Sequence, residues 1–330
     1  MRGRIRGATA AIVIAFSLSH NALQAQIPGS LVDASTTGVP PGRVLADVRS
    51  TIVVTEAWIA SSNQGSRVLS DRNFLSGAAL VVAVDGFTVQ YCRFNGRGGL
   101  GTFPNTDALP MGRNVSVLDC EFDGQDENLG DAVAVYGSSL TLKRVHVHNW
   151  PRAMWVGDGD IWVENCYFHD LTCDGKGAHI ENVYVAGGAN QTYIGNKMIS
   201  NAKPAKNSAQ ISASLAMYNE GYWRGKPFPP FPKLERILVQ GNYFETDGYY
   251  ALYCGAVVGK PAPYASAMVV RDNVFGRKLQ RWSGRGGPAV CFDPAQPGNV
   301  WENNIWGPPG PDSLPGDPPE GAIIPPPRPQ

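Results

Sequence analysis

The sequence predicts an all-β protein in which short parallel strands are wound into a solenoid, and three observations support this prediction. A short phrase of alternating apolar residues recurs along the chain, as in VSVLDCEFDG, IWVENCYFHD and MVVRDNVFGR. The chain contains 38 glycines and 26 prolines, which favour turns over helices. Residues that tolerate a left-handed backbone stand at the same point of most copies of the phrase.

The phrase aligns on one column of mostly Cys or Asn residues, and successive copies lie 21 to 45 residues apart. Repeats of this length are typical of solenoids. Period-two alternation on both sides of the column predicts two strands in each copy, which meet at a corner. The column consists of Cys92, Cys120, Val145, Cys166, Lys197, Asn242, Asn273 and Asn304.

The residue before this column is predicted to form the corner itself. Six of the eight corner residues are Asn, Asp or Gly, which adopt a positive φ more readily than other types. A backbone that bends at the same place in every turn stacks its coils about 4.8 Å apart. The corner residues are Tyr91, Asp119, Arg144, Asn165, Asn196, Gly241, Asp272 and Asn303.

A third strand in each coil is predicted after the longer loops, at residues 107–111, 131–135, 152–156, 181–185, 214–218 and 250–254. With three strands per turn and loops of uneven length, the chain resembles the right-handed parallel β-helix of the pectate-lyase-like superfamily, which includes exported bacterial proteins. The resemblance covers about residues 78–306. It implies the architecture and leaves the activity open.

The two ends of the chain are predicted to differ from this repeat. Residues 1–25 are expected to be a secretory signal peptide, because three arginines precede a short apolar stretch and small residues then offer a cleavage point. Residues 26–77 are expected to cap the open end of the stack. Residues 307–330 are rich in proline and are expected to be an extended or disordered tail.

The charge balance restricts the partners. With 28 basic and 28 acidic residues, the sequence gives no electrostatic argument for nucleic acid or for an anionic membrane surface. No stretch beyond the signal peptide is long and apolar enough to span a bilayer. The expected product is a secreted monomer, extracellular or periplasmic, that acts on a polysaccharide.

Six cysteines in an exported chain suggest disulfides. Cys254 and Cys291 fall at similar places on neighbouring coils, so a bridge between them is predicted. Cys92 and Cys120 also occupy neighbouring coils and could form either a bridge or a pair of stacked thiols. No CxxC pair or Cys/His zinc spacing occurs, and no metal site is predicted.

The first residues of the third strands form the predicted catalytic column of Asp107, Asp131, Arg152 and Glu181. Carboxylates on adjacent coils would lie about 5 Å apart at the backbone, and two acids in unequal environments can divide into proton donor and base. Arg152 could neutralise the carboxylate of a uronic acid. The alternative is a surface ion ladder without chemistry.

Two short motifs resemble those of polygalacturonase-type glycoside hydrolases. Residues 105–107 read Asn-Thr-Asp, and GDAVAV (130–135) follows one coil later, so Asp107 and Asp131 match acids of that family's motifs. The sequence departs from the family at Gly130, which replaces an Asp, and at residues 151–153, which replace Gly-His-Gly. The resemblance implies acid/base roles for the two aspartates and leaves the rest of that machinery unmatched.

The loop 169–182 brings further titratable groups to the same side. His179 or Lys176 could act as a base on the C5 proton of a sugar, with Arg152 holding the carboxylate. The alternative is that these side chains only fix the loop through hydrogen bonds.

Aromatic residues on the third strands suggest a binding surface. Trp155 and Tyr184 fall on neighbouring coils and are predicted to form a flat platform for sugar rings. The insertion 218–233 could either cover this platform or form a cleft wall that includes Arg224.

Two further groups carry ligand-binding alternatives. His146 and His148 alternate along one strand and should both point outward, either as a solvated strand face, which is the prediction, or as metal ligands. No cofactor is predicted with certainty, although the acidic loop 123–128 (DGQDEN) could hold Ca²⁺.

Together these observations predict an exported carbohydrate-active protein, either a lyase or a glycoside hydrolase. The alternative is a glycan-binding, adhesion or envelope protein without catalysis.

Overall fold

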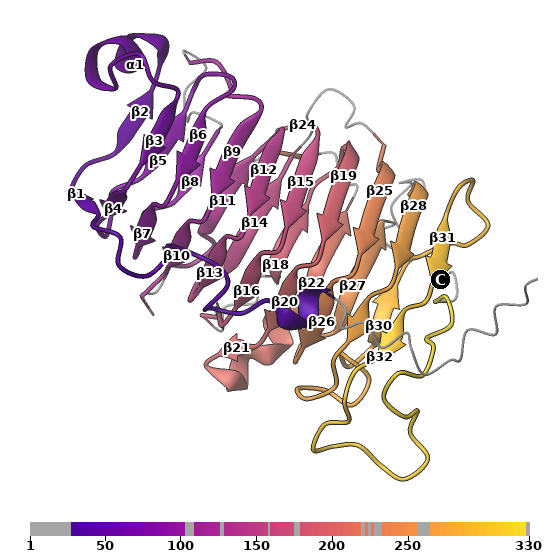
Figure 1. Ribbon diagram of the computed structural model, residues 1–330. Helices are drawn as coiled ribbons and strands as arrows, with labels where there is room; N and C mark the ends of the chain where they lie inside the picture. The colour runs from indigo at the N-terminus through magenta and orange to yellow at the C-terminus, as the bar shows by residue number, and fades with distance from the viewer. Residues whose placement is uncertain are drawn as a thin grey trace, which may run out of the picture.

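The computed structural model describes residues 28–102, 109–125, 129–157, 159–174, 179–218, 222–223, 226–227, 233–255 and 265–327. The fold is a right-handed parallel β-helix in which each coil contributes one strand to each of three parallel sheets (Figure 1). The predicted fold class is therefore confirmed.

Sheet A contains ten strands. Each coil begins with one of them and then contributes a strand to sheet B and a strand to sheet C. In spatial order they are β1 (Ala46–Val48), β4 (Arg72–Phe74), β7 (Arg93–Asn95), β10 (Glu121–Asp123), β13 (His146–His148), β16 (Tyr167–His169), β20 (Lys197–Ser200), β26 (Tyr243–Thr246), β29 (Val274–Phe275) and β32 (Ile305–Trp306).

Sheet B contains nine strands, which follow those of sheet A along each coil. They are β2 (Ile52–Val54), β5 (Leu80–Val82), β8 (Leu100–Gly101), β11 (Val133–Gly137), β14 (Arg152–Val156), β18 (Ile180–Val185), β22 (Ile211–Tyr218), β27 (Tyr250–Gly255) and β30 (Gly287–Val290).

Sheet C closes each coil and also contains nine strands. They are β3 (Val68–Ser70), β6 (Thr88–Gln90), β9 (Val115–Leu118), β12 (Leu140–Lys143), β15 (Ile161–Glu164), β19 (Ala189–Ile194), β25 (Glu235–Gln240), β28 (Ser266–Arg271) and β31 (Val300–Glu302). Smaller elements lie outside the three sheets: α1 (Glu56–Ser62), η2 (Pro28–Leu31), η3 (Ala205–Gln210), the parallel pair β17 (Leu171–Thr172) and β21 (Ala202–Lys203), and the antiparallel pair β23 (Tyr222–Trp223) and β24 (Lys226–Pro227).

The corner between sheets C and A has the predicted left-handed backbone on every aligned coil. The corner φ values lie between 50° and 65°, from 50° at Asp119 to 65° at Gly241. One position needs correction: the corner residue of the fifth copy is Gly195, with a φ of 64°, and not Asn196. Lys197 consequently leaves the column and pairs with Tyr167, while Asn196 takes its place and is fully buried.

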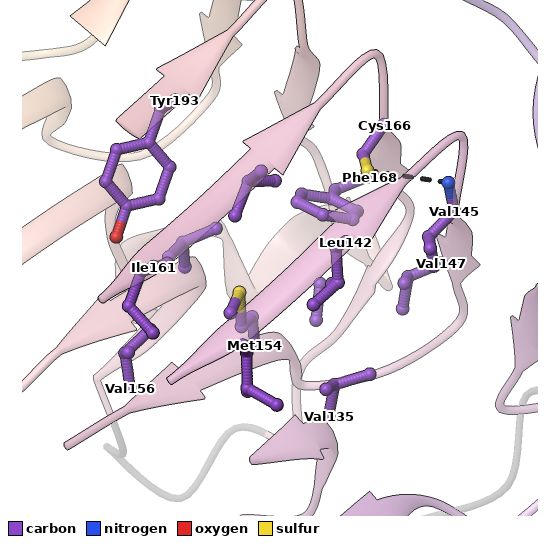
Figure 2. Close-up of a cluster of buried hydrophobic side chains, with 14 of the residues drawn as sticks. Val135, Leu142, Val145, Val147, Met154, Val156, Ile161, Cys166, Phe168 and Tyr193 are labelled. Carbon is purple, nitrogen blue, oxygen red and sulfur yellow. Dashed lines mark hydrogen bonds between the residues drawn. The ribbon is translucent and has the colours of Figure 1, made fainter. Parts of the chain in front are cut away.

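The side chains of the Cys/Asn column stack inside the corner and bind the backbone of the neighbouring coil. Asn242 donates from Nδ2 to the carbonyl of Tyr193 at 2.9 Å and to Oδ1 of Asn273 at 3.0 Å. The Cys166 sulfur accepts from the amide of Val145 at 3.4 Å (Figure 2). A ladder of this kind satisfies buried backbone groups at a bend where no sheet pairing can.

The interior is filled by layers of apolar side chains, which Figure 2 shows for the middle coils. Phenylalanines on sheet A stack on one another, with 4.4 Å between the ring centroids of Phe74 and Phe94 and 4.4 Å between those of Phe94 and Phe122. Full burial of each such ring contributes about 1.5–3 kcal/mol. The packing of like residues on successive coils holds the register of the sheets.

Five of the six predicted third strands overlap strands of sheet B, and the one at 107–111 is wrong. That coil uses β8 (Leu100–Gly101), where Leu100 is fully buried opposite Val135. A Cβ on Gly101 would lie 2.1 Å from Cζ of Tyr136, so this glycine makes room for the tyrosine ring. Residues 109–111 form no strand, and Asp107 lies outside the described residues.

The N-terminal segment extends the fold beyond the predicted limits. Sheet strands begin at Ala46, well before residue 78, and α1 lies at the N-terminal end of the stack (Figure 1). Residues 28–45 run along the outside of sheet A and its corner with sheet C. The Gly29 amide donates to the corner carbonyl of Gly241 and the Gly38 amide to that of Arg144, and a Cβ on Gly38 would lie 3.1 Å from Cβ of His146 on β13. The segment therefore covers part of the outward face of this sheet.

The proline-rich tail has more contacts than its composition suggests. The Ile324 amide donates to the carbonyl of Asn304 at 2.7 Å, and Ile324 itself is buried. The buried guanidinium of Arg277 donates to the carbonyls of Gly307 and Pro318. Prolines exclude this segment from a regular sheet, but its apolar and polar contacts hold it against the last coil.

The predicted disulfide between Cys254 and Cys291 is wrong, because all six cysteines are free thiols. Cys254 lies on β27 and Cys291 directly follows the neighbouring strand β30, next to the pair of Tyr253 and Val290. Cys291 has a φ of 60°, and it packs in a cluster with Val290 that is separate from the main core containing Cys254. Neighbouring backbones alone do not make a bridge, because the Cβ atoms must also face each other.

Cys92 and Cys120 are stacked thiols, the second of the two predicted alternatives.

Within the described residues, no helix is both long and apolar enough to cross a bilayer.

Candidate functional site

The outward face of sheet B carries a row of aromatic side chains, which we call the aromatic row: Tyr136, Trp155, Tyr184, Tyr218 and Tyr253. Tyr136 pairs with Trp155 and Trp155 with Tyr184 in the register of β11, β14 and β18. Their strand neighbours Met154, Val156 and Val183 lie in the core, so the aromatic rings point outward. The row follows the stacking direction of the coils.

From Trp155 to Tyr253, neighbouring rings of the aromatic row are in contact but are not coplanar. The centroids of Trp155 and Tyr184 lie 5.8 Å apart with an interplanar angle of 79°. Tyr184 and Tyr218 lie 5.4 Å apart, and Tyr218 and Tyr253 lie 4.7 Å apart, with angles of 46° and 50°. The predicted pairing of Trp155 with Tyr184 is confirmed, whereas the flat shape of the platform is wrong. The edge-to-face arrangement is the one that ring quadrupoles favour.

Charged residues gather at the start of the same strands. Nε of Arg152 lies 3.1 Å from Oε2 of Glu181, and its Nη1 lies 3.9 Å from Oδ1 of Asp131. Another guanidinium nitrogen of Arg152 donates to the carbonyl of His179. The guanidinium carbon also lies 6.0 Å from the ring centroid of Tyr184, so this charged group adjoins the aromatic row.

A β-bulge completes the surroundings of Glu181. The register of β18 and β22 shifts between Ile180 and Glu181, which leaves Ser212 as the extra residue. The Ser212 hydroxyl donates to the second carboxylate oxygen of Glu181 and accepts from the Tyr218 hydroxyl at 3.3 Å. Bulges often aim a side chain in this way, and here the bulge links the charged group to Tyr218.

The predicted catalytic column is brought together only in part. The register partner of Arg152 on β11 is Val133, so Asp131 stands two residues before the column in which it was placed. Its side chain is 72% exposed, whereas that of Glu181 is completely buried. His179 contributes its carbonyl oxygen, and its side chain is exposed. Lys176 and Arg224, like Asp107, lie outside the described residues.

Sequence reasoning missed three members of the aromatic row, although a signal was present. When the third strands are aligned on their register, the fourth residue is aromatic in VAVYG, RAMWV, ENVYV and YALYC. The shift of two residues at Asp131 hid Tyr136 from this pattern. Tyr218 depends on the bulge in β22, which has no comparable signal in the sequence.

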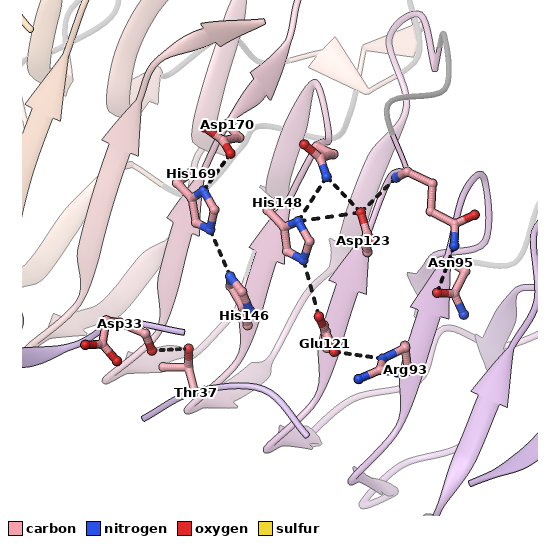
Figure 3. A network of polar contacts seen from close by, with 12 residues as sticks. Asp33, Thr37, Arg93, Asn95, Glu121, Asp123, His146, His148, His169 and Asp170 are labelled. Atoms are coloured by element: carbon pink, nitrogen blue, oxygen red, sulfur yellow. Dashed lines mark hydrogen bonds and ion pairs between the residues drawn. The ribbon is translucent and has the colours of Figure 1, made fainter. Parts of the chain in front are cut away.

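A second polar group lies on the outward face of sheet A, and we call its four central residues the histidine cluster: Glu121, His146, His148 and His169 (Figure 3). Nε2 of His146 lies 2.9 Å from Nε2 of His169, and Nε2 of His148 lies 3.3 Å from Oε1 of Glu121. Both histidines of strand β13 point outward, as predicted. His146 is nevertheless only 7% exposed, so the predicted solvated strand face is wrong for this residue.

The surroundings within the histidine cluster lower the pKa values of two of its members. The hydrogen bond from His148, together with the nearby Arg93, lowers the pKa of Glu121 to about 2. Burial, followed by the charges of His148 and His169, lowers the pKa of His146 to about 4. At neutral pH the cluster therefore contains an ionised Glu121 and a neutral His146.

The loop that could hold Ca²⁺ is described only as far as Gln125. Oδ1 of Asp123 accepts from the Gln125 amide at 2.8 Å and from Nδ2 of Asn149 at 2.9 Å. This oxygen therefore serves the loop backbone and a neighbouring coil, and the remaining acids of the loop lie outside the described residues.

A search of protein-family models, curated proteins and solved structures found no match for this chain.

Proposed function

We propose that the protein binds an extracellular polysaccharide along the outward face of sheet B, with sugar rings packed against the aromatic row. The proposal depends on one observation, namely that outward aromatic side chains recur on successive coils of sheet B. Tyr136, Trp155 and Tyr184 are in register, whereas on β22 the register position is Ala216 and the aromatic residue, Tyr218, stands two residues further along. The apolar faces of sugars pack on aromatic rings, while tyrosine hydroxyls offer hydrogen bonds at the edges.

The geometry of the row fits a polymer better than a small ligand. The rings extend over β11, β14, β18, β22 and β27, and solenoids commonly bind along such extended surfaces. The chain has no net charge, so affinity would come from many stacking contacts and not from electrostatic attraction. The predicted signal peptide would place the protein where such polymers occur.

The test is retention of the purified protein on a panel of insoluble glycans. Trp155→Ala or Tyr184→Ala should weaken binding to the retained glycan at least tenfold, or about 1.4 kcal/mol. Trp162→Ala is the matched control, because Trp162 is a 40% exposed tryptophan on β15 of sheet C. The proposal fails if Trp155→Ala binds as the wild type does, or if Trp162→Ala loses as much affinity.

A second candidate, a polysaccharide lyase or glycoside hydrolase, is favoured by the charged group beside the aromatic row. An exposed carboxylate, Asp131, and a buried one, Glu181, lie on either side of the Arg152 guanidinium. Such unequal environments can separate an acid from a base. Both oxygens of Glu181 already have partners, which leaves Asp131 as the group that reaches solvent.

Catalysis would be detected as new reducing ends, or as the ultraviolet absorbance of an unsaturated uronate, when the wild type meets the bound glycan. Asp131→Asn should then abolish turnover and retain binding. If the wild type leaves the bound glycan intact, the binding function stands without the enzymatic one.

A further inference from the structure

We propose that Glu121, His146, His148 and His169 form a binding site for a divalent transition-metal ion, with Zn²⁺ as the best fit. One ligand atom each from Glu121, His146 and His148 lies within 4.8 Å of the others. His169 lies outside this group of three, and its Nε2 is 2.9 Å from Nε2 of His146. The site lies on sheet A and is independent of the polysaccharide proposed for sheet B.

Two of the distances between the ligand atoms are close to those around a tetrahedral ion. Zn²⁺ binds imidazole nitrogens and carboxylate oxygens at about 2.0–2.2 Å, so neighbouring ligand atoms in a tetrahedron are about 3.3 Å apart. The two closest contacts in the histidine cluster are 2.9 Å and 3.3 Å. The ligands come from β10, β13 and β16, which are adjacent strands of one sheet, so small side-chain rotations would complete the geometry.

The outer nitrogen of two of the imidazoles has a polar partner. Nδ1 of His169 lies 3.2 Å from Oδ2 of Asp170, and Nδ1 of His148 lies 3.5 Å from Oδ1 of Asp123 and 3.0 Å from Nδ2 of Asn149. At His148 the Asn149 amide donates to Nδ1, so Nε2 carries the hydrogen that is donated to Glu121, and an ion would displace this hydrogen. At His169 the Asp170 carboxylate at Nδ1 favours the tautomer in which Nε2 has a free lone pair. This is the arrangement that metal-binding histidines commonly show, and it directs Nε2 of His169 toward His146.

Glu121 is held in a similar way. Nε of Arg93 lies 2.8 Å from Oε2, so the other oxygen, Oε1, faces His148 and is available to an ion. Three imidazoles and one carboxylate suit Zn²⁺ and its first-row neighbours, whereas Ca²⁺ and Mg²⁺ prefer oxygen ligands throughout.

The surroundings of the cluster give an ion partial shelter and a route of entry. On one side the N-terminal segment packs closely, since a Cβ on Gly38 would lie 3.1 Å from Cβ of His146. On the other side the side chains of His148, His169 and Glu121 remain 16–18% exposed. Arg93, which contacts Glu121, also lines a hollow of about 280 Å³ between the N-terminal segment and sheet A.

The test is calorimetric titration of Zn²⁺ into untagged protein that has been stripped with a chelator and dialysed. We expect one Zn²⁺ per chain with micromolar or tighter affinity, and at least tenfold weaker binding in His148→Asn and in His169→Asn. His179→Asn is the control, because His179 is an exposed histidine outside the cluster and its loss should leave binding unchanged.

A second measurement does not depend on the variants being folded. Co²⁺ added to the stripped wild type should give the intense visible bands of a tetrahedral site with nitrogen ligands, and Zn²⁺ should displace them. The proposal is overturned if the wild type shows no titratable Zn²⁺ site, if the Co²⁺ spectrum remains that of the hydrated ion, or if folded His148→Asn and His169→Asn bind Zn²⁺ as tightly as the wild type.

Discussion

Replacing Asn242 with alanine should destabilise the β-helix more than any exposed substitution, because this side chain joins three coils. Its Nδ2 donates to the carbonyl of Tyr193 and to Oδ1 of Asn273, and its Oδ1 accepts from the backbone and side-chain nitrogens of Asn196, all at 2.9–3.0 Å. Alanine leaves the buried Asn196 amide and the Tyr193 carbonyl without these partners. At about 1–3 kcal/mol for each buried group left unsatisfied, the expected loss is about 3–5 kcal/mol.

The assay is urea denaturation followed by circular dichroism, with two further variants. Glu302→Ala, on the exposed side of β31, should change the free energy of unfolding by less than about 0.5 kcal/mol. Asn242→Cys should fall between the two, because a sulfur in this column can accept a backbone amide as Cys166 does from Val145. A loss below about 1 kcal/mol for Asn242→Ala would refute the role given to the ladder.

Two other predictions concern stability. Burial raises the pKa of Asp247 above its usual value of 3.8, so the folded protein keeps a proton that the unfolded chain releases, and stability falls as pH rises through that interval. Asp247→Asn should therefore raise the melting temperature at pH 7, with a gain that shrinks below pH 3.8, as calorimetry would show; a lower melting temperature at pH 7 would contradict this. Ile324→Ala should cost about 2–3 kcal/mol if the tail caps the last coil, and an unchanged urea midpoint would show that the tail contributes nothing.

The repeat in the sequence predicted the architecture because the corner is a local requirement. A positive φ must recur once per coil, and Asn, Asp and Gly meet this need wherever they occur. The same tolerance explains the one error: Gly195 and Asn196 both suit a corner, and the apolar pattern before them fits either alignment. A shift by one residue exchanges inward and outward faces, so Lys197 was assigned to the interior.

The third strands were harder to place because loops of variable length precede them. The strand of the third coil was predicted at 107–111, whereas the short β8 at Leu100–Gly101 has little sequence signal beyond one buried leucine. The register error at Asp131 has the same origin, since only the pairing of Val133 with Arg152 fixes it. Contacts along the stack decide these positions, and the local sequence does not.

The pairing of the histidine-cluster residues is already present in the alignment of the repeats. Glu121 and His146 each follow the Cys/Asn column by one residue, and His148 and His169 follow it by three. Their pairing in sheet A could therefore be inferred from the sequence. The orientation of the rings could not, because it depends on Asp170, Asp123 and the N-terminal segment. The Cys291 side chain was misplaced for a similar reason, since its positive φ has no sequence signal.

The most direct test of the proposed function is a crystal structure of the protein with an oligosaccharide of the retained glycan. We predict that the sugar chain lies along sheet B, with rings against Trp155 and Tyr184 and its length following the stack of coils. A sugar chain bound at sheet C, or in the hollow beside Arg93, with the aromatic row uncovered, would contradict it.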